Sequence, residues 1–400
     1  MKIAIYCNNI PQCRFFLRLV DALKSRGDQV LFWSNRLSVV LMARQFGQQA
    51  FLLKRFGRIG DGNLIENPEL SFENKHGILT RAAASRCITR AEAAVRCFFQ
   101  NHQPDQLWVW NGCNLVRQTM VAEAVRMGIG RLFFEVGNFP GKLFVDKEGV
   151  NCRSWYFKHR HELRKSYVDM GGFKVWKEAF LATKRQQHLV PQARFADTFN
   201  LKFIYDLIGF WFLGAITSDP PRPVWRTIDF MQKMLHQVPL DVFQPEREPG
   251  YFFFPLQVST DSQVLWNSDI SQADALRKAT EMARKEGRLL VVKPHPAEPH
   301  WAATRKILHL KKQLGFKLVG GNTFILLEHC SRAITLNSTV GLEAILLGKP
   351  VLTLGHAHYS GFDELDLIIY IEKYLLNIDF FSEEPISESQ LDAVLTRGNI

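Results

Sequence analysis

Arg332-Ala-Ile-Thr-Leu-Asn-Ser-Thr-Val-Gly-Leu-Glu-Ala-Ile-Leu-Leu-Gly-Lys-Pro-Val-Leu352 contains a complete strand–turn–helix–strand pattern. The apolar run 333–336 predicts a short buried strand. Residues 337–339 are of types that begin helices, and apolar residues then recur at helical spacing. Gly348, followed by Pro350, predicts the end of that helix and the start of another strand. This pattern favours an α/β fold with a parallel sheet.

The turn in this stretch is a candidate anion site. Asn337, Ser338 and Thr339 place two hydroxyls and unpaired backbone N–H groups at the positive end of a predicted helix. Glu343 follows Thr339 by one helical turn, so both side chains can face one ligand. The alternative is an ordinary hydroxyl cap on an α/β crossover.

Length and composition indicate a two-domain globular protein. The chain has 400 residues, of which 46% are hydrophobic and 22% are charged. The net charge of +11 suggests an anionic partner: a nucleotide, a nucleic acid or a membrane surface. The seven cysteines form no CxxC pair, which argues against a zinc ribbon or a disulfide framework and favours a cytoplasmic setting. No uncharged run is long enough for a membrane-spanning helix.

The first half offers two candidate catalytic carboxylates. Its opening strand–helix–strand unit lacks GxGxxG, which makes a nicotinamide site improbable. Glu135 follows a predicted strand, and Asp146 lies beyond a turn-rich loop. The alternative places Glu135 in a cap or an ion pair, and Asp146 in a plain turn. Asn111 and Asn151, at the ends of neighbouring segments, are candidate acceptor-side residues.

Residues 153–226 form a basic and aromatic region, with 13 Lys and Arg residues against six Asp and Glu. We interpret 153–235 as a helical insert whose aromatic side chains belong to a core. The second interpretation is an interfacial membrane contact or an acceptor-binding surface, and nucleic-acid binding is the least favoured. A Pro/Glu-rich segment at 244–250 predicts a boundary between domains 1–245 and 246–400.

Polar residues follow three predicted strands of the second half: Gln257, the pair Lys293 and His295, and residues 337–339. In an open α/β sheet these strand ends converge on one edge. The two cations suit a phosphate, and Glu343 could accept hydrogen bonds from ribose hydroxyls. The alternative for Lys293-Pro-His-Pro296 is an ordinary loop with a solvated lysine. Two Rossmann-like halves with a nucleotide site in the second suggest a GT-B glycosyltransferase, with Glu135 and Asp146 serving sugar transfer.

Five motifs carry a resemblance to a known family. They are Phe254-Pro-Leu-Gln-Val258 with Asp261 and Gln263, Lys293-Pro-His-Pro296, Asn337-Ser-Thr-Val-Gly-Leu-Glu343, Gly348-Lys-Pro-Val351, and Glu135-x-Gly137 with Asp146 and Gly149-Val-Asn151. The first four resemble the bacterial capsule polysaccharide biosynthesis family. The fifth looks like the branch that builds the Kdo linker of lipid-anchored capsules, although this chain has Val136 where many relatives carry a second acid.

The resemblance implies a GT-B fold, CMP-β-Kdo as donor, a glycolipid acceptor and a peripheral position at the inner membrane face. It assigns CMP binding to His295, Ser338 and Thr339. We expect no metal, because no DxD motif lies near these strand ends. The rival interpretations are a non-hydrolysing sugar-nucleotide epimerase and a polysaccharide-export or scaffold protein that has lost its chemistry.

Overall fold

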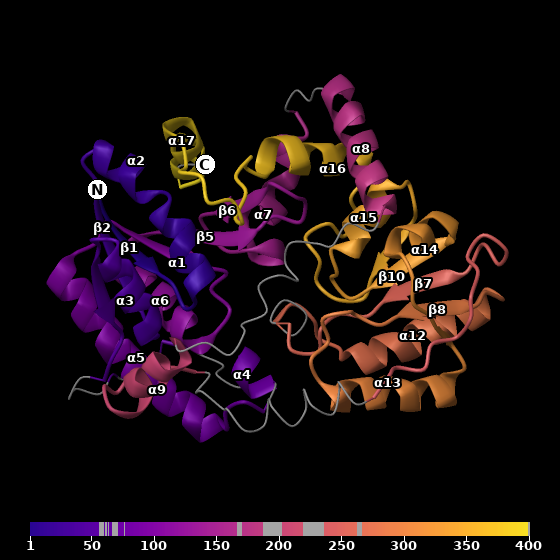
Figure 1. The fold of residues 1–400 in the computed structure, drawn as a ribbon, viewed down its shortest axis with the longest axis horizontal. Coiled ribbons are helices and arrows are strands. Elements are labelled where there is room, and N and C mark those ends of the chain that lie inside the picture. The colour runs from indigo at the N-terminus through magenta and orange to yellow at the C-terminus, as the bar shows by residue number, and fades with distance from the viewer. Residues whose placement is uncertain are drawn as a thin grey trace. The chain divides into compact units, whose positions relative to one another are not determined.

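The computed structural model describes residues 1–55, 60, 62, 64–65, 71–75, 77–165, 170–186, 202–218, 236–261 and 266–398. These residues form two compact units (Figure 1). Unit 1 comprises residues 1–158, 196–221 and 374–400, and unit 2 comprises residues 159–195 and 222–373. Each unit contains one sheet and is described by itself.

Unit 1 is built on a six-stranded sheet in the order β3-β2-β1-β4-β5-β6. Five strands are parallel, and β6 pairs antiparallel with β5. The strands are β1 (Lys2–Tyr6), β2 (Gln29–Ser34), β3 (Gln49–Leu52), β4 (Gln106–Trp110), β5 (Gly130–Val136) and β6 (Leu143–Asp146). The helices are α1 (Ile10–Leu17), α2 (Val20–Ser25), α3 (Leu37–Gln45), α4 (Phe72–Lys75), α5 (Arg81–His102), α6 (Leu115–Arg126), the start of α7 (Trp155–Leu163), α9 (Lys202–Trp211) and α17 (Glu388–Thr396).

Alternate residues of the unit 1 strands enter different layers. Ile5, Phe32 and Phe134 lie in the main core with residues of α1 and α3, while Trp33, from the other face of β2, stacks on Phe98 of α5. Helices therefore cover both faces of a largely parallel sheet, which explains why its strands read as nearly continuous apolar runs.

Unit 2 has a five-stranded parallel sheet in the order β11-β10-β7-β8-β9. Its strands are β7 (Phe252–Pro255), β8 (Leu290–Lys293), β9 (Lys317–Leu318), β10 (Arg332–Thr335) and β11 (Val351–Thr353). Its helices are α8 (Met170–Arg185), α12 (Gln272–Lys285), α13 (Trp301–Leu314), α14 (Thr323–His329), α15 (Val340–Leu346) and α16 (Glu364–Ile369), followed by a π-helical turn at Tyr370–Tyr374. The sheet is again buried on both faces, because two separate core clusters take alternate residues of β7, β8 and β10.

The prediction of two Rossmann-like α/β domains is confirmed, since each unit is a sheet wound with helices on both faces. The domain boundaries differ from the predicted 245/246 division. Residues 374–400 return to unit 1, where Leu376 bridges to Leu143 of β6 and Arg18 donates to the carbonyls of Asp379 and Glu384. The division at 244–250 was read from local composition, which carries no signal of this long-range packing.

The described part of the 153–235 insert is mainly helical, in α7, α8 and α9, but its residues are divided between the two units. Residues 159–195 belong to unit 2, and residues 196–221 belong to unit 1. Tyr156, Phe173 and Phe180 are buried, in agreement with the core interpretation, whereas Trp211 and Phe212 are exposed. Residues 166–169, 187–201 and 219–235 of the insert lie outside the described residues, as does Gln263 of the second-half motif.

Candidate functional site

The loops after β10, β7 and β8 leave the same edge of the unit 2 sheet, because these three parallel strands are neighbours. Two predicted residues are in direct contact there. Gln257 Nε2 donates to Asn337 Oδ1 at 3.0 Å, and Asn337 N donates back to Gln257 Oε1 at 3.3 Å. Asn337 Nδ2 also donates to the carbonyl of Asn267 at 3.2 Å. This reciprocal pair fixes the loop after β10 against the loop after β7.

Glu298 joins the loops after β7 and β8, and sequence reasoning did not select it. Its carboxylate accepts from Ser259 N at 2.6 Å, from Ser259 Oγ at 2.9 Å and from His300 N at 2.9 Å. The available signal was an acid two residues after Lys293-Pro-His-Pro296. The half-buried His295 lies in this loop, and its Nδ1 accepts from Ala297 N at 3.1 Å. In the neutral ring this bond leaves the proton on Nε2, which makes Nε2 a donor.

Lys293 ends β8 with its ammonium partly removed from water. Its Nζ donates to Thr323 Oγ1 at 2.5 Å, at the start of α14. Burial lowers the pKa of Lys293, and the nearby Glu343 carboxylate opposes that shift. A partly desolvated cation at a strand end is suited to an anionic ligand, because it has lost part of its hydration before the ligand arrives.

Ser338 and Thr339 precede α15, as predicted. Ser338 Oγ accepts from Val340 N at 3.3 Å, and Ser338 N donates to Thr335 Oγ1 at 3.2 Å. The carbonyl of Ser338 accepts from the hydroxyl of Tyr359. Thr339 occupies the N-cap position with an exposed side chain. The turn is therefore held rigid by Ser338 while Thr339 faces solvent.

Glu343 has an intramolecular partner that the sequence did not predict. It is buried, and its Oε1 lies 2.6 Å from Lys184 Nζ of α8. The same end of α8 carries Arg185, which pairs with Glu328, and the α8 backbone accepts hydrogen bonds from Asn322. Glu343, whose carboxylate we expected to bind a ribose, thus forms one of the contacts that hold α8 against α14 and α15.

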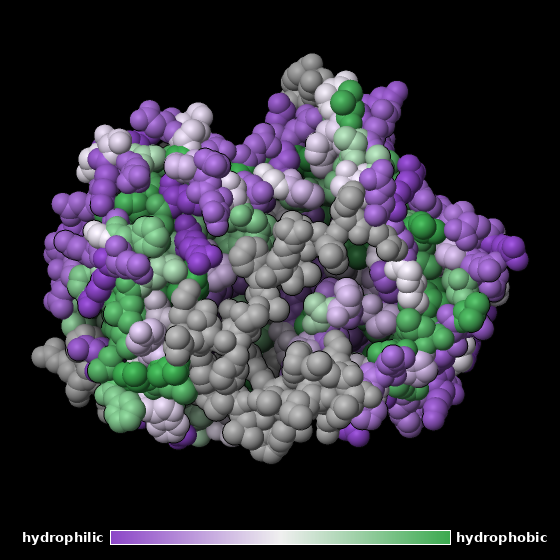
Figure 2. Space-filling model, in the orientation of Figure 1, coloured by the Kyte–Doolittle hydropathy of each residue, from purple (hydrophilic) through white to green (hydrophobic). Residues whose placement is uncertain are grey.

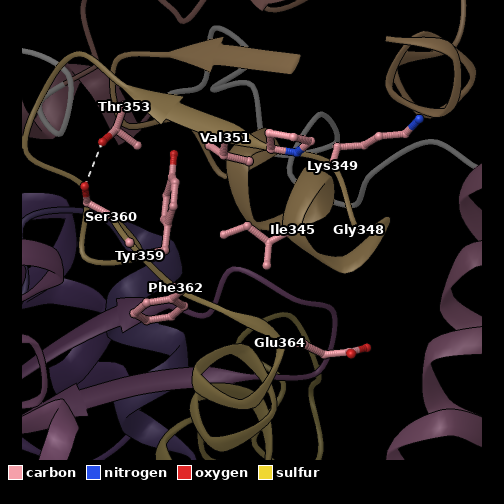
Figure 3. Close-up of a pocket in the computed structure, with 11 residues that line it drawn as sticks. Ile345, Gly348, Lys349, Val351, Thr353, Tyr359, Ser360, Phe362 and Glu364 are labelled. Atoms are coloured by element: carbon pink, nitrogen blue, oxygen red, sulfur yellow. Dashed lines mark hydrogen bonds between the residues drawn. The ribbon is translucent and has the colours of Figure 1, made fainter. Parts of the chain in front are cut away.

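A pocket of about 380 Å³ lies beside this turn, between the C-terminal end of α15, β11 and the loop after β11 (Figure 3). Ile345, Val351, Tyr359 and Phe362 give it apolar walls, and Thr353 and Ser360 are joined by a 3.0 Å hydrogen bond on one side. The ring of Tyr359 lines the pocket while its hydroxyl bonds Ser338, so the pocket wall and the predicted anion turn share one side chain.

In unit 1, Glu135 is placed on β5 with its side chain half-buried. Its Oε1 accepts from Trp110 Nε1 at 3.1 Å and from the backbone N of Val136 at 3.0 Å. Val136 pairs with the core residue Leu143 and packs against the main core. Successive strand residues point to opposite faces, so an acid at position 136 would point away from Glu135 and into apolar surroundings.

Asp146 differs from the expectation of a catalytic group. It ends β6 and is only 1% exposed. Its oxygens accept from the backbone N–H groups of Glu148, Gly149, Trp155 and Tyr156 at 2.7–3.2 Å, and from the hydroxyl of Tyr374. Five donors on one buried carboxylate close the loop and cap the start of α7, a structural role more extensive than the plain turn stated above as the alternative.

The two acceptor-side asparagines shape turns next to these acids. Asn111 has φ +43° directly after β4, and its Oδ1 accepts from Cys113 N at 3.2 Å. Asn151 has φ +54° at the start of a single 3₁₀ turn, and its carbonyl accepts from Ser154. Asparagine is one of the few residues with a side chain that tolerates this left-handed conformation.

Among the described residues, no three or more histidine, cysteine, aspartate or glutamate side chains are grouped so as to hold a metal ion. Among the helices that the structure describes, none is both long enough and apolar enough to span a bilayer.

Residues 230–363 match the model of the family described as capsule polysaccharide biosynthesis protein. Over this segment the chain is similar to the capsule polysaccharide biosynthesis family. All seven donor-side residues predicted in the second half lie inside the matched segment. Glu135 and Asp146 lie outside it, so their roles are not inherited from this match.

Two curated relatives are also similar to this chain in sequence. Protein FixF of Sinorhizobium fredii (strain NBRC 101917 / NGR234) is 26% identical over 299 residues, which cover 70% of this chain and 57% of FixF. Capsule polysaccharide export protein KpsS of Escherichia coli is 24% identical over 296 residues, which cover 66% of this chain and 71% of KpsS. The chain therefore matches little more than half the length of FixF.

Among solved structures, the chain is similar to Thermosulfurimonas dismutans KpsC, titled beta Kdo 2,7 transferase. The identity is 14%, the TM-score is 0.48, and the alignment covers 100% of this chain and 99% of that one. UDP-GlcNAc 2-epimerase of Neisseria meningitidis aligns over 99% of both chains at 11% identity, with a TM-score of 0.31.

Proposed function

We propose that this chain is a glycosyltransferase that takes a sugar, Kdo by the resemblance of its motifs, from a CMP-activated donor. The supporting observation is the polar edge of the unit 2 sheet. There the Gln257–Asn337 pair, Lys293 and His295 follow adjacent strands within the segment that matches the family. A nucleotide with one phosphate needs a small number of well-placed donors, and this edge supplies them.

In this proposal each donor-side residue has a separate role. His295 Nε2 donates to the phosphate and the Lys293 ammonium pairs with it, and the positive charge of Lys293 serves in place of a metal ion. The loop 337–339 provides further donors, with Ser338 held in position by Thr335 and Tyr359. The Gln257–Asn337 pair aligns the two loops, so a cytidine phosphate meets groups already in place.

Glu135 is the carboxylate that we propose for sugar transfer. It accepts the proton of the acceptor hydroxyl as that hydroxyl attacks the anomeric carbon, and the bond from that carbon to the CMP phosphate oxygen breaks. Trp110 Nε1 fixes its orientation. Asp146 supports the adjacent loop and takes no part in the chemistry. We further propose a glycolipid acceptor and a peripheral position at the inner membrane face.

The test uses Glu135→Gln, which keeps the size and polarity of the side chain but removes the base. Label transfer from CMP-Kdo to a lipid-linked Kdo oligosaccharide, with release of CMP, is measured for the native chain and the variant. We expect CMP binding to be unchanged in E135Q and turnover to fall by roughly 100-fold or more. Full activity of E135Q would remove Glu135 from the mechanism. CMP binding by the native chain without any turnover would favour the export or scaffold interpretation.

A further inference from the structure

The short helix α9 turns its apolar face toward solvent. Gly209 is buried where α9 crosses α3, with Leu37 Cβ only 3.1 Å from the place a Gly209 Cβ would occupy. Asp206 also faces inward, where it accepts from Ser38 N at 3.0 Å. The opposite side carries six large, exposed apolar residues, which we name the α9 patch: Ile204, Tyr205, Ile208, Trp211, Phe212 and Leu213.

This arrangement is the reverse of the usual amphipathic surface helix, whose apolar side packs on the core. Trp211 is 70% exposed and Phe212 is 83% exposed, and both lie at the C-terminal end of α9. In Figure 2 hydrophobic atoms gather over α9 at the lower left. Contiguous exposed apolar side chains of this kind mark an interaction site.

The positively charged residues beside the α9 patch favour an anionic partner. Lys54 and Arg55 are exposed, and their backbone pairs with the segment that follows α9, through an Ala215 bridge and an Arg55 N to Gly214 O bond at 3.0 Å. The acid of α9 is turned inward, so exposed cations border the patch. Aromatic side chains flanked by cations suit an anionic lipid surface.

The size of the α9 patch also favours a lipid surface over a second copy of the chain. A standard protein interface uses roughly 20–30 residues on each side, and six side chains are far fewer. An interfacial contact needs only a few side chains that reach the boundary between headgroups and acyl chains.

We propose that the α9 patch inserts into the headgroup region of an anionic membrane, with Lys54 and Arg55 held against the lipid phosphates. The inference deepens the proposed function, since a lipid-linked acceptor is reached at such a surface. Its test does not depend on catalysis, so the two proposals can fail separately.

The experiment measures co-sedimentation of the full chain with vesicles of phosphatidylcholine, alone or mixed with phosphatidylglycerol. The native chain should bind the mixed vesicles more tightly. The double variant Trp211→Ser with Phe212→Ser should weaken this binding by roughly tenfold or more, because binding scales with the apolar area buried. The variant Lys54→Glu with Arg55→Glu should abolish the preference for phosphatidylglycerol.

Val175→Ser is the matched control, because Val175 of α8 is 70% exposed, as Trp211 is, and lies outside the α9 patch. It should bind as the native chain does. Circular dichroism and the thermal unfolding transition confirm that each variant is folded. Absence of vesicle binding by the native chain, or equal binding by the Trp211/Phe212 variant, would overturn the proposal. So would a native dimer that becomes a monomer in that variant, because the patch would then be an interface between copies.

Discussion

Two carboxylates at the end of the unit 1 sheet have different surroundings. Asp146 is buried beneath five donors, whereas Glu135 is half-buried and accepts from Trp110 and its own neighbour. Hydrogen bonds to a buried carboxylate stabilise the folded state, and their loss leaves several donors unsatisfied.

Asp146→Ala should therefore lower the free energy of unfolding by about 3 kcal/mol, because backbone N–H groups of the loop and of the start of α7 lose their acceptor. Urea unfolding measures the change. Glu148→Ala is the control, since Glu148 forms a surface ion pair with the exposed Lys158 and its loss should cost less than about 1 kcal/mol. Equal costs for the two variants would show that Asp146 is not a structural centre.

His358 in unit 2 is buried among Tyr359, Phe362 and Tyr370. Burial lowers the pKa of His358 to about 3, and the nearby Arg160 adds to the shift. The unfolded chain takes up this proton near pH 6.5, whereas the folded chain takes it up only near pH 3. The contribution of His358 to the free energy of unfolding is therefore fully present above pH 6.5, and it is lost as the pH falls toward 3.

At pH 5 this one group should reduce the free energy of unfolding by about 2 kcal/mol relative to pH 8. His358→Gln should remove that part of the pH dependence, whatever the variant costs in absolute stability. Urea unfolding of both proteins from pH 8 to pH 5 measures it. Identical slopes against pH would contradict the assignment.

At the level of elements, α8 is fastened to the predicted nucleotide edge by side chains of opposite charge. Lys184 pairs with Glu343 at 2.6 Å, and the side chains of both are mostly shielded from solvent. Phe180 packs edge-on against Phe324 of α14 beside this pair. The packing of helix α8 therefore depends on Glu343, which the sequence analysis predicted to bind a ribose.

A double-mutant cycle of Lys184→Met and Glu343→Gln should give a coupling energy of about 1 kcal/mol, because the pair is partly desolvated. Lys177→Met with Glu364→Gln is the matched control. Its glutamate is 64% exposed, and its coupling should be well below that of the first pair. Urea unfolding of the native chain and the six variants provides all seven values. A coupling no larger than that of the control would mean that Glu343 does not hold α8.

The elements with strong local signals could be predicted closely. Apolar periodicity predicts helices over 301–314 and 323–329, and these are the bounds of α13, which ends before Gly315, and of α14, which begins after the capping Asn322. Ser271, a residue type that begins helices, caps α12. Strand β6 was not predicted, because its four residues follow a turn-rich segment and carry no clear strand pattern of their own. They become a strand by pairing antiparallel with β5. Apolar periodicity over 15–26 predicts one helix, but the structure has two, α1 and α2, because the carbonyl of Arg18 accepts a hydrogen bond from Ile386 N of the C-terminal segment.

For the whole molecule, the sequence predicted two α/β units and one polar edge, because both follow from strand–helix alternation. It could not predict the return of residues 374–400 to unit 1, the Glu298 bridge or the Lys184–Glu343 pair, because each joins side chains far apart in the chain. The Gln257–Asn337 contact could be foreseen only through the convergence of parallel strand ends.

The central claim is that the unit 2 edge binds a cytidine phosphate, and melting shifts with CMP and UDP test it most directly, since a ligand that binds the folded state stabilises it by mass action. CMP should raise the melting temperature of the native chain more than UDP. His295→Ala and Ser338→Ala should each weaken CMP binding by about 10–100-fold, while His309→Ala, at an exposed histidine of α13, should not. Equal shifts with UDP, or unchanged CMP affinity in both site variants, would contradict the account.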